Sequence, residues 1–403
     1  MTLWSGRVDT TVAPEVAELL HADDAELFFY DVEGTRLHAR RLAAAGVLSG
    51  DEMHTVERQL DGLGWEPGHE DVHTAIEVGL GELGRKIHAG RSRNDQVATA
   101  LRLYVTDASA EAVEAIERFA RTVLDRAEEE AETPMPGYTH LQRVQTVTVG
   151  HHLLAWVEML DRDRARFRFA REQSLPLPLG AAALAGSTLA LPPPPGQTMR
   201  NSLDAVADRD FALDYVYASA VLASHLSRIG EELVLWSSSE FAFVRLPERA
   251  ATGSSAMPQK LNPDVAELVR GKAGTALGRL TGLLATIKGL PLAYNRDLQE
   301  DKPPVFAARR DVRLSLGGLT VLVAELGFDR GRLASASSDP LLLATDAAEE
   351  LVRQGVPFRD AHERVAEEIR AGTFEPPSES ASRDAPGPGG VAAALEDARR
   401  RFA

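Results

Sequence analysis

Apolar residues with helical spacing dominate this chain. Over 95–132 they recur every three or four positions with charged residues between them, which predicts one long amphipathic helix. The same spacing predicts further long helices over 146–173, 211–239, 263–288 and 303–326. Alternating apolar and polar stretches typical of strands are scarce. We therefore predict an all-α fold built on a central bundle of long helices.

The lengths of these helices bear on domain organisation. A helix of about 27 residues is roughly 40 Å long, so lateral partners must cover it, and we expect some of them to come from other subunits. Glycine and proline predict an irregular connection over 175–196, and a flexible one over 374–390 before a short final helix, 391–402. We predict an N-terminal helical domain, a central long-helix domain and a shortened C-terminal helical domain: 1–90, 91–327 and 328–403.

Composition limits the possible partners of the protein. The chain has 403 residues, of which 44% are hydrophobic and 26% charged, as in soluble globular proteins. Its net charge of -16 disfavours nucleic acid and anionic membranes as partners, and the absence of cysteine excludes disulfides and thiolate chemistry. No apolar stretch is long enough for a bilayer, and the start lacks a signal peptide's pattern. We predict a cytoplasmic protein with neither a nucleic-acid nor a membrane partner.

The segment 252–264 joins a glycine, two serines and a lysine to the start of a predicted helix. Asn262 suits the N-cap and Pro263 the first helical position. Backbone N–H groups at that helix start, together with Lys260, favour negative charge, either on a substrate carboxylate or on a hydroxyl losing its proton. The segment therefore predicts an anion site, although glycine and serine alone would also suit an ordinary surface loop.

Two further clusters combine polar groups with turns. The run 90–96 places two arginines ahead of a long helix, which suits carboxylate binding, although Ser92 or Asn94 could merely cap that helix. The run 136–143 places His140 near another predicted helix start, and we consider it the best acid–base candidate among the 11 histidines.

Three more polar runs are ambiguous by themselves. The acidic residues and histidine of 70–77 lie one helical turn apart and could in principle bind a metal, which we do not expect. The run 201–210 has the composition of a polar turn. The dense charges of 294–302 would usually form a solvated helix face.

Taken together, these motifs resemble the fumarase/aspartase superfamily, whose members eliminate a group from a succinyl unit to leave fumarate. Pro-Gln-Lys over 258–260 followed by Asn-Pro-Asp over 262–264 most resembles the argininosuccinate lyase family. The resemblance runs from Trp4 to His362. It implies reversible β-elimination of argininosuccinate to arginine and fumarate in arginine biosynthesis, without cofactor or metal. It also implies a homotetramer in which three subunits contribute to each active site.

The resemblance also suggests catalytic roles. We interpret Ser254 as the base that removes the carbon-bound proton, if neighbouring amides and a cation lower its pKa. Lys260 and Asn262 would stabilise the carbanion, and His140 would protonate the leaving nitrogen. The opposite assignment, with the histidine as base and the serine as acid, remains open.

The remaining implied site residues contact substrate. Among them Tyr294, Gln299 and Lys302 bind the amino-acid end, which favours argininosuccinate over simpler succinyl compounds. The full set comprises Asp71, His73, Ser92, Arg93, Asn94, Thr139, Arg209, Asn262, Asp264, Glu267, Tyr294, Gln299 and Lys302.

The chain departs from the family pattern in three places. The substrate-binding serine expected around 20–24 is missing, Leu261 replaces a second lysine, and the region after Phe374 is short. Two other functions therefore remain possible: a different fumarate-forming lyase, such as one resembling adenylosuccinate lyase, or a catalytically idle structural homologue, as in lens crystallin.

Overall fold

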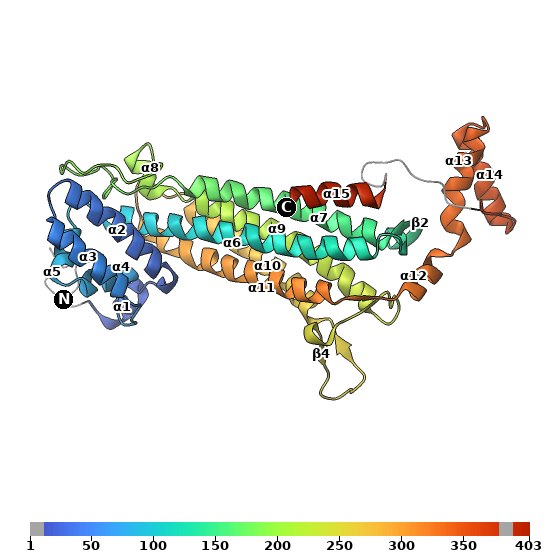
Figure 1. The fold of residues 1–403 in the computed structure, drawn as a ribbon, viewed down its shortest axis with the longest axis horizontal. Helices are drawn as coiled ribbons and strands as arrows, with labels where there is room; N and C mark the ends of the chain where they lie inside the picture. The colour runs from blue at the N-terminus through green and yellow to red at the C-terminus, as the bar shows by residue number, and fades with distance from the viewer. Residues whose placement is uncertain (1–11, 379–389) are drawn as a thin grey trace. The chain divides into compact units, whose positions relative to one another are not determined.

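The computed structural model describes residues 12–378 and 390–403, and most of its regular structure is helical (Figure 1). The all-α prediction is therefore confirmed. Within these ranges, no helix combines the length and the apolar composition needed to cross a bilayer. Most of the predicted connection 374–390 lies outside the described residues.

Within the described residues, five helices have 23 residues or more, and each agrees with a predicted helix to within one turn. The apolar spacing predicted these helices because it marks their buried faces. Leu101, Ile116 and Phe119 are fully buried on one face of the longest helix, while charged residues occupy the other. The five are α6 (Arg93–Glu129), α7 (Val149–Ser174), α9 (Asp210–Ser237), α10 (Asp264–Ile287) and α11 (Lys302–Ala324).

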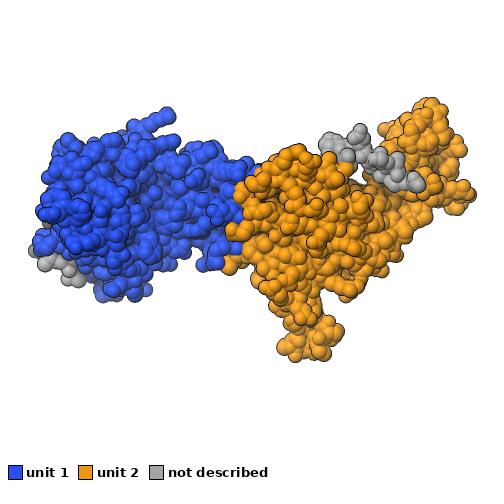
Figure 2. Space-filling view, in the orientation of Figure 1, with its two compact units in different colours: residues 1–114, 163–223, 273–313 blue, residues 115–162, 224–272, 314–403 orange. Residues whose placement is uncertain are grey.

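Contacts divide the chain into two compact units, coloured separately in Figure 2. Unit 1 comprises Met1–Glu114, Asp163–Ala223 and Ala273–Arg313; unit 2 comprises Ala115–Arg162, Ser224–Lys272 and Leu314–Ala403. Each of the five long helices contributes a segment to both units. The predicted division into three successive domains stays a prediction.

Short helices in unit 1 pack around α2 (Phe28–Ala44), which contacts α3 (Gly50–Gly62), α4 (Val72–Gly79) and α5 (Glu82–Ile87). A capping box begins α3: the Ser49 side chain accepts a hydrogen bond from the Glu52 N–H, and the Glu52 carboxylate accepts one from the Ser49 N–H. The segment 175–201 is irregular, as predicted. The remaining elements are α1 (Pro14–Leu20), η1 (Ala25–Leu27), α8 (Ser202–Ala207) and η3 (Arg296–Asp301).

Unit 2 contains short antiparallel pairs that the sequence analysis did not predict. Strand β1 (Pro134–Thr139) pairs with β2 (Gln142–Thr148), so the helix expected from 146 begins only at Val149. β4 (Thr252–Gly253) pairs with β5 (Leu261–Asn262). The other elements are β3 (Val244–Arg245), which pairs with β6 (Gly327–Phe328), η2 (Glu248–Ala250), α12 (Arg330–Ser337), η4 (Pro340–Leu343), α13 (Ala344–Arg353), α14 (Phe358–Ala371) and α15 (Val391–Arg401).

Candidate active site

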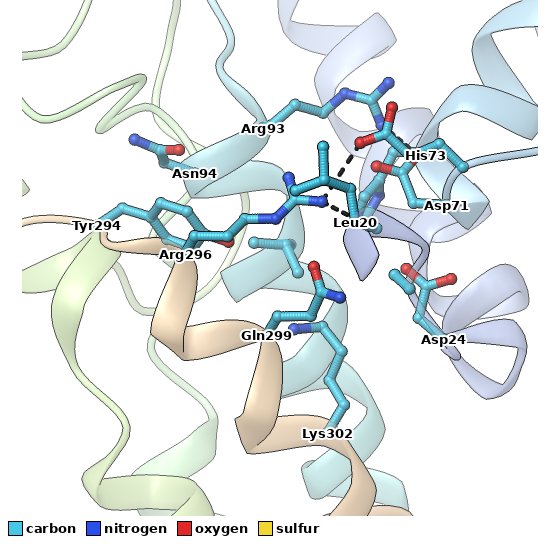
Figure 3. A pocket seen from close by; sticks show the side chains of 13 residues that line it. Leu20, Asp24, Asp71, His73, Arg93, Asn94, Tyr294, Arg296, Gln299 and Lys302 are labelled. Atoms are coloured by element: carbon cyan, nitrogen blue, oxygen red, sulfur yellow. Dashed lines mark hydrogen bonds and ion pairs between the residues drawn. The ribbon is translucent and has the colours of Figure 1, made fainter. Parts of the chain in front are cut away.

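A charged pocket of about 380 Å³ lies in unit 1 (Figure 3). In the view of Figure 3, Asp71 and His73 lie on the right and Asn94 and Tyr294 on the left, with Arg296 between them. The pocket brings together seven residues that the sequence analysis predicted from three separate motifs: Asp71, His73, Arg93, Asn94, Tyr294, Gln299 and Lys302.

Asp71 joins two of these motifs. It is the N-cap of α4, and its Oδ1 accepts hydrogen bonds from the Thr74 N–H and hydroxyl, each at 2.7 Å. The same oxygen accepts a hydrogen bond from Arg93 Nη1 at 2.8 Å. Burial alone would raise the pKa of Asp71, but His73, Arg93 and the Thr74 donors together lower it to about 2. Asp71 is therefore ionised, and its carboxylate holds the Arg93 guanidinium beside the pocket.

His73 is buried, and the carboxylate of Asp31 holds its imidazole ring in place. The distance from His73 Nδ1 to Asp31 Oδ2 is 2.8 Å, and Gln96 Nε2 donates to both Asp31 oxygens. Burial lowers the pKa of His73, but the Asp31 charge outweighs it and the net shift is upward. His73 Nε2 has no hydrogen-bond partner among the described residues. The ring therefore presents an unused polar atom in a residue that lines the pocket.

The run 294–302 lines the pocket beside the segment after α1. Arg296 Nη2 donates to the Leu20 carbonyl at 2.7 Å, and Gln299 Nε2 donates to the His21 carbonyl at 3.0 Å. Burial raises the pKa of Tyr294, which keeps its phenol protonated. The run predicted as a possible solvated face is therefore tied to the N-terminal segment.

Lys302 begins α11 and is 4% exposed. Its ammonium donates to Asp301 Oδ1 at 2.9 Å and to the Leu298 carbonyl at 3.2 Å. Arg209 donates to the other oxygen of Asp301 and is itself buried. Arg209 does not line the pocket, so its predicted contact with a substrate carboxylate stays a prediction; what the structure supports is a role in fixing Asp301.

The start of α6 combines capping with site formation. The Ser92 hydroxyl accepts a hydrogen bond from the Asn94 N–H at 3.3 Å, as the capping interpretation predicted. Asn94 Nδ2 donates to the Ala183 carbonyl at 3.0 Å and Asn94 lines the pocket, whereas Ser92 does not. Buried Asp95 accepts hydrogen bonds from Gly180 and Ala182 N–H groups, which ties the irregular segment to this helix start.

Thr139 and His140 lie in the turn of the β1–β2 hairpin in unit 2. Thr139 pairs with Gln142, which leaves His140 and Leu141 as a two-residue turn, with φ values of 55° and 57°. Such turns favour glycine or asparagine, because other side chains are strained at positive φ. His140 is exposed. Strain in a turn that carries a candidate acid–base group is a common sign of a functional constraint.

The segment between β4 and β5 carries Ser254 and Lys260. The Ser254 hydroxyl accepts hydrogen bonds from the N–H groups of Ala256 at 3.3 Å and Met257 at 3.1 Å. These two donors favour negative charge on the oxygen. Lys260 is exposed and makes no ion pair within the described part of the chain. The segment therefore meets part of the sequence prediction: amide donors surround Ser254, but no contact links it to Lys260.

The helix start beyond this segment differs from the prediction. α10 begins at Asp264, and the Pro263 carbonyl accepts a hydrogen bond from the Glu267 N–H at 3.1 Å, so Pro263 rather than Asn262 is the capping residue. Asn262 lies in β5 because it pairs with Thr252. Thr252 also donates to Asp264, and Glu267 is exposed.

The residues that line the pocket match the predicted site residues only in part. The lining includes neither His140 nor Ser254. It does include Asp24, Glu70 and Arg296, which the sequence analysis did not assign to the site. Glu70 and Arg296 lie within the runs 70–77 and 294–302, so the other residues of those runs could have indicated that both belong to the site. For Asp24, the only signal in the sequence was its position within 20–24, where a substrate-binding serine was expected.

Comparison with known proteins identifies the family. Residues 65–278 match a family described as lyase, and 341–373 match the argininosuccinate lyase C-terminal family. Argininosuccinate lyase of Frankia casuarinae is 48% identical over 91% of this chain and 84% of its own. That of Acidothermus cellulolyticus is 49% identical, over 90% and 79%.

Solved structures show the same fold. An EDDS lyase crystallised with formate has a TM-score of 0.81 and 26% identity, covering 98% of this chain and 91% of its own. The class II fumarase of Schistosoma mansoni has a TM-score of 0.75 at 15% identity, with 91% and 93% covered, which is evidence for the fold alone. The chain thus belongs to the argininosuccinate lyase family of the fumarase/aspartase superfamily.

Proposed function

We propose that this chain is a cytoplasmic carbon–nitrogen lyase of arginine biosynthesis that converts argininosuccinate reversibly to arginine and fumarate. The observation that carries the proposal is the convergence of Tyr294, Gln299 and Lys302 with Asp71, His73 and Arg93 in one pocket. The family resemblance assigns the run of the first three residues to the amino-acid end and the run of Arg93 to the fumarate-derived carboxylates. It places Asp71 and His73 in the substrate pocket. A substrate with both features fits this pocket better than a simple succinyl compound.

The reaction requires one proton to leave carbon and one to reach nitrogen. A base removes the hydrogen next to a carboxylate, and negative charge develops on that carboxylate; the C–N bond then breaks and a C=C bond forms. The departing guanidine nitrogen must gain a proton. The proton leaves one carbon, and the nitrogen departs from the carbon next to it. Because the two proton transfers occur at different positions, two side chains have to act on one substrate.

We assign the base to Ser254 and the acid to His140. The two amide donors at the Ser254 hydroxyl support the base assignment, because they would stabilise the alkoxide that must form. Lys260 would neutralise charge on the substrate carboxylate in the carbanion. His140 would protonate the leaving nitrogen, and its strained turn supports a role that needs a fixed ring position.

A homotetramer with shared active sites completes the proposal. The pocket lining contains neither His140 nor Ser254, so further groups have to join it before reaction. Helix α10 also has an uncovered face: Leu277 and Leu284 are exposed, and a Cβ atom at Gly274 or Gly278 on the same side would meet nothing within 4 Å. Small and apolar residues on one long helix favour close packing against another helix.

A substrate panel tests the proposed function. The purified protein is incubated separately with argininosuccinate, adenylosuccinate, aspartate and malate, while fumarate is followed by ultraviolet absorbance and arginine is measured in parallel. We expect fumarate and arginine in equal amounts from argininosuccinate alone. Fumarate from only one of the other compounds would replace the assignment, and no fumarate from any of them would indicate an idle structural homologue.

A further inference from the structure

The hairpin turn that carries His140 has little support of its own. His140 and Leu141 have φ values of 55° and 57°, where a side chain is strained. Both residues are exposed, so neither side chain anchors the turn by burial. The pairing of the two strands also shifts register between Pro136 and Tyr138. The position of the His140 ring therefore depends on groups that hold the hairpin next to the turn.

Arg143 is one such group. It follows the turn on β2 and pairs with Tyr138 across the hairpin. Its Nη1 donates a hydrogen bond to the Ala336 carbonyl in the last turn of α12, at 3.2 Å. The residue four positions beyond Ala336 is Pro340, which has no N–H to offer that carbonyl. The Arg143 guanidinium thus supplies a donor, and a positive charge, at the negative end of the helix dipole.

Helix α12 is itself tied to the elements around the hairpin. Its N-cap Asp329 accepts a hydrogen bond from the Arg332 N–H at 2.9 Å and donates its own N–H to the Phe243 carbonyl at 2.8 Å. Arg330 makes two hydrogen bonds of 3.0 Å to the carboxylate of Glu130. Glu130 is 4% exposed and lies between α6 and β1. Helix α12 is therefore a fixed point to which the hairpin can be fastened.

A second contact reaches the other strand of the hairpin through Tyr138. Its ring lies against that of Phe241, with the ring centroids 5.9 Å apart. Arg332 of α12 holds the backbone at this place, because its Nε donates to the Phe241 carbonyl at 3.1 Å and its Nη2 to the Glu240 carbonyl at 3.0 Å. Helix α12 thus holds both strands next to the turn, directly at Arg143 and through Phe241 at Tyr138.

A cavity makes these few contacts important. It measures about 480 Å³, and its lining includes Tyr138 and Arg143 of the hairpin, Phe241, Arg332 and Leu342. Close packing therefore does not fill the space between the hairpin and α12, and dispersion contacts are lost there. The hydrogen bonds of the two arginines carry correspondingly more of the support.

We propose that Arg143 is a positioning residue for His140, and that Arg332 acts on the same turn through Phe241. In this role Arg143 does not touch the substrate; it fixes the turn so that the imidazole meets the leaving nitrogen. A misplacement of about 1 Å can cost roughly 100-fold in rate. The inference rests on the proposed function, including His140 as the acid, and extends it by naming the groups that place that acid.

A double-mutant cycle tests whether Arg143 acts through His140. Arg143→Met keeps an unbranched stem without the donors, and His140→Asn removes the acid while keeping a residue that tolerates positive φ. In steady-state kinetics with argininosuccinate, we expect Arg143→Met to lower kcat by roughly 10- to 100-fold with KM close to wild type. Added to His140→Asn, it should change kcat by less than about twofold, because the group that it positions is gone.

Two controls separate positioning from a general loss of stability. Arg143→Lys keeps a cation with N–H donors and should recover part of the lost kcat. Arg121→Met removes a matched hydrogen bond, from Arg121 Nη1 to the Phe402 carbonyl at 3.2 Å, and should leave kcat unchanged. If Arg143→Met does not fold, Arg332→Met gives the same cycle, with the same expected loss that disappears in the His140→Asn background.

Equal losses of kcat in both backgrounds would overturn the inference, because the effect would then be independent of His140, and so would an unchanged kcat in Arg143→Met. Near-normal turnover of His140→Asn would overturn the acid assignment and this inference together. A wild-type protein that cleaves only another compound of the substrate panel would overturn the proposed function alone, and the cycle is then run on that compound. No fumarate from any compound would overturn both.

Discussion

The pocket in unit 1 and the β4–β5 segment in unit 2 carry the two halves of the proposed site in opposite ways. His73 and Lys302 are almost fully buried, and each is held by a buried carboxylate. Lys260 and most of its neighbours are exposed, and the Ser254 hydroxyl is bonded only within its own segment. The groups proposed to bind substrate are thus fixed by the fold, whereas the groups proposed for the chemistry have few fixed contacts.

This difference has an energetic reason. A group that must recognise charge benefits from a dry, preorganised setting, where each interaction is stronger than in water. Such a setting is stable only if every buried charge is paired, as His73 is with Asp31. Ser254 has no such support, so its proposed reactivity requires that substrate and, in the proposed tetramer, other subunits surround it. Substitutions in the two regions should therefore have different consequences.

The largest effect is expected at Ser254. Ser254→Ala should lower kcat on the order of 10³-fold or more, because the proposed base is lost, while substrate affinity and melting temperature stay close to wild type. Steady-state kinetics and calorimetry with argininosuccinate measure both. Ser255→Ala is the matched control, since it removes a neighbouring hydroxyl from the same segment. Near-normal turnover of the Ser254 variant would remove that residue from the mechanism.

A large loss of stability is expected instead at Asp31. Asp31→Asn removes the charge opposite buried His73 and should destabilise the protein by about 3 kcal/mol. Thermal unfolding at fixed protein concentration checks this. Glu33→Gln is the control on the same helix, because Glu33 forms an exposed pair with Arg36 whose removal should change stability by less than about 0.5 kcal/mol. Equal melting temperatures for both variants would contradict the view of a charge-supported pocket.

A pH-dependent effect is expected at Asp71. Its pKa falls from 3.8 to about 2 on folding, so it contributes roughly 2 kcal/mol, present above pH 4 and lost as pH falls through 2. Asp71→Asn should lose this contribution at neutral pH and show a flatter stability profile between pH 4 and 2. Asp23→Asn, which replaces an exposed carboxyl, should keep the wild-type profile in that window.

The smallest effect is expected at the turn of the β1–β2 hairpin. Leu141 is 69% exposed and has a φ of 57°, so Leu141→Gly relieves strain without losing much buried surface. We expect a gain of about 0.5 kcal/mol, measured by thermal unfolding. Leu261→Gly is the control: this exposed leucine lies in β5, where glycine should destabilise by a similar amount. A destabilised Leu141 variant would show that the turn is not strained.

The sequence predicted the long helices well because their buried apolar residues recur with the period of an α-helix. Leu101, Ile116 and Phe119 repeat with helical spacing, and all are buried. The β1–β2 hairpin escaped prediction because its turn is His140–Leu141 rather than the asparagine and glycine that mark such turns. Similarly, β5 depends on pairing with β4 ten residues away, which no local pattern at Asn262 reveals.

Dense motifs contained most of the predicted residues that line the pocket, whereas an isolated lining residue was missed. Asp71, Arg93 and Lys302 were predicted from three separate runs, and the fold brings those runs to one pocket. Asp24 was missed because its place in the pocket comes from burial beside Val72, which local sequence does not contain. Arg209 was predicted to contact substrate, but its local motif could not reveal the pairing with Asp301.

We propose that the pocket of one copy works with the Ser254 segment of another copy in a tetramer. Mixing two inactive variants within one assembly tests it: Ser254→Ala and Lys302→Met are produced together with different affinity tags, and tetramers carrying both tags are isolated. We expect clear argininosuccinate cleavage by the mixed tetramers, because some sites combine an intact pocket with an intact segment. Mixed tetramers no more active than either variant alone would contradict it.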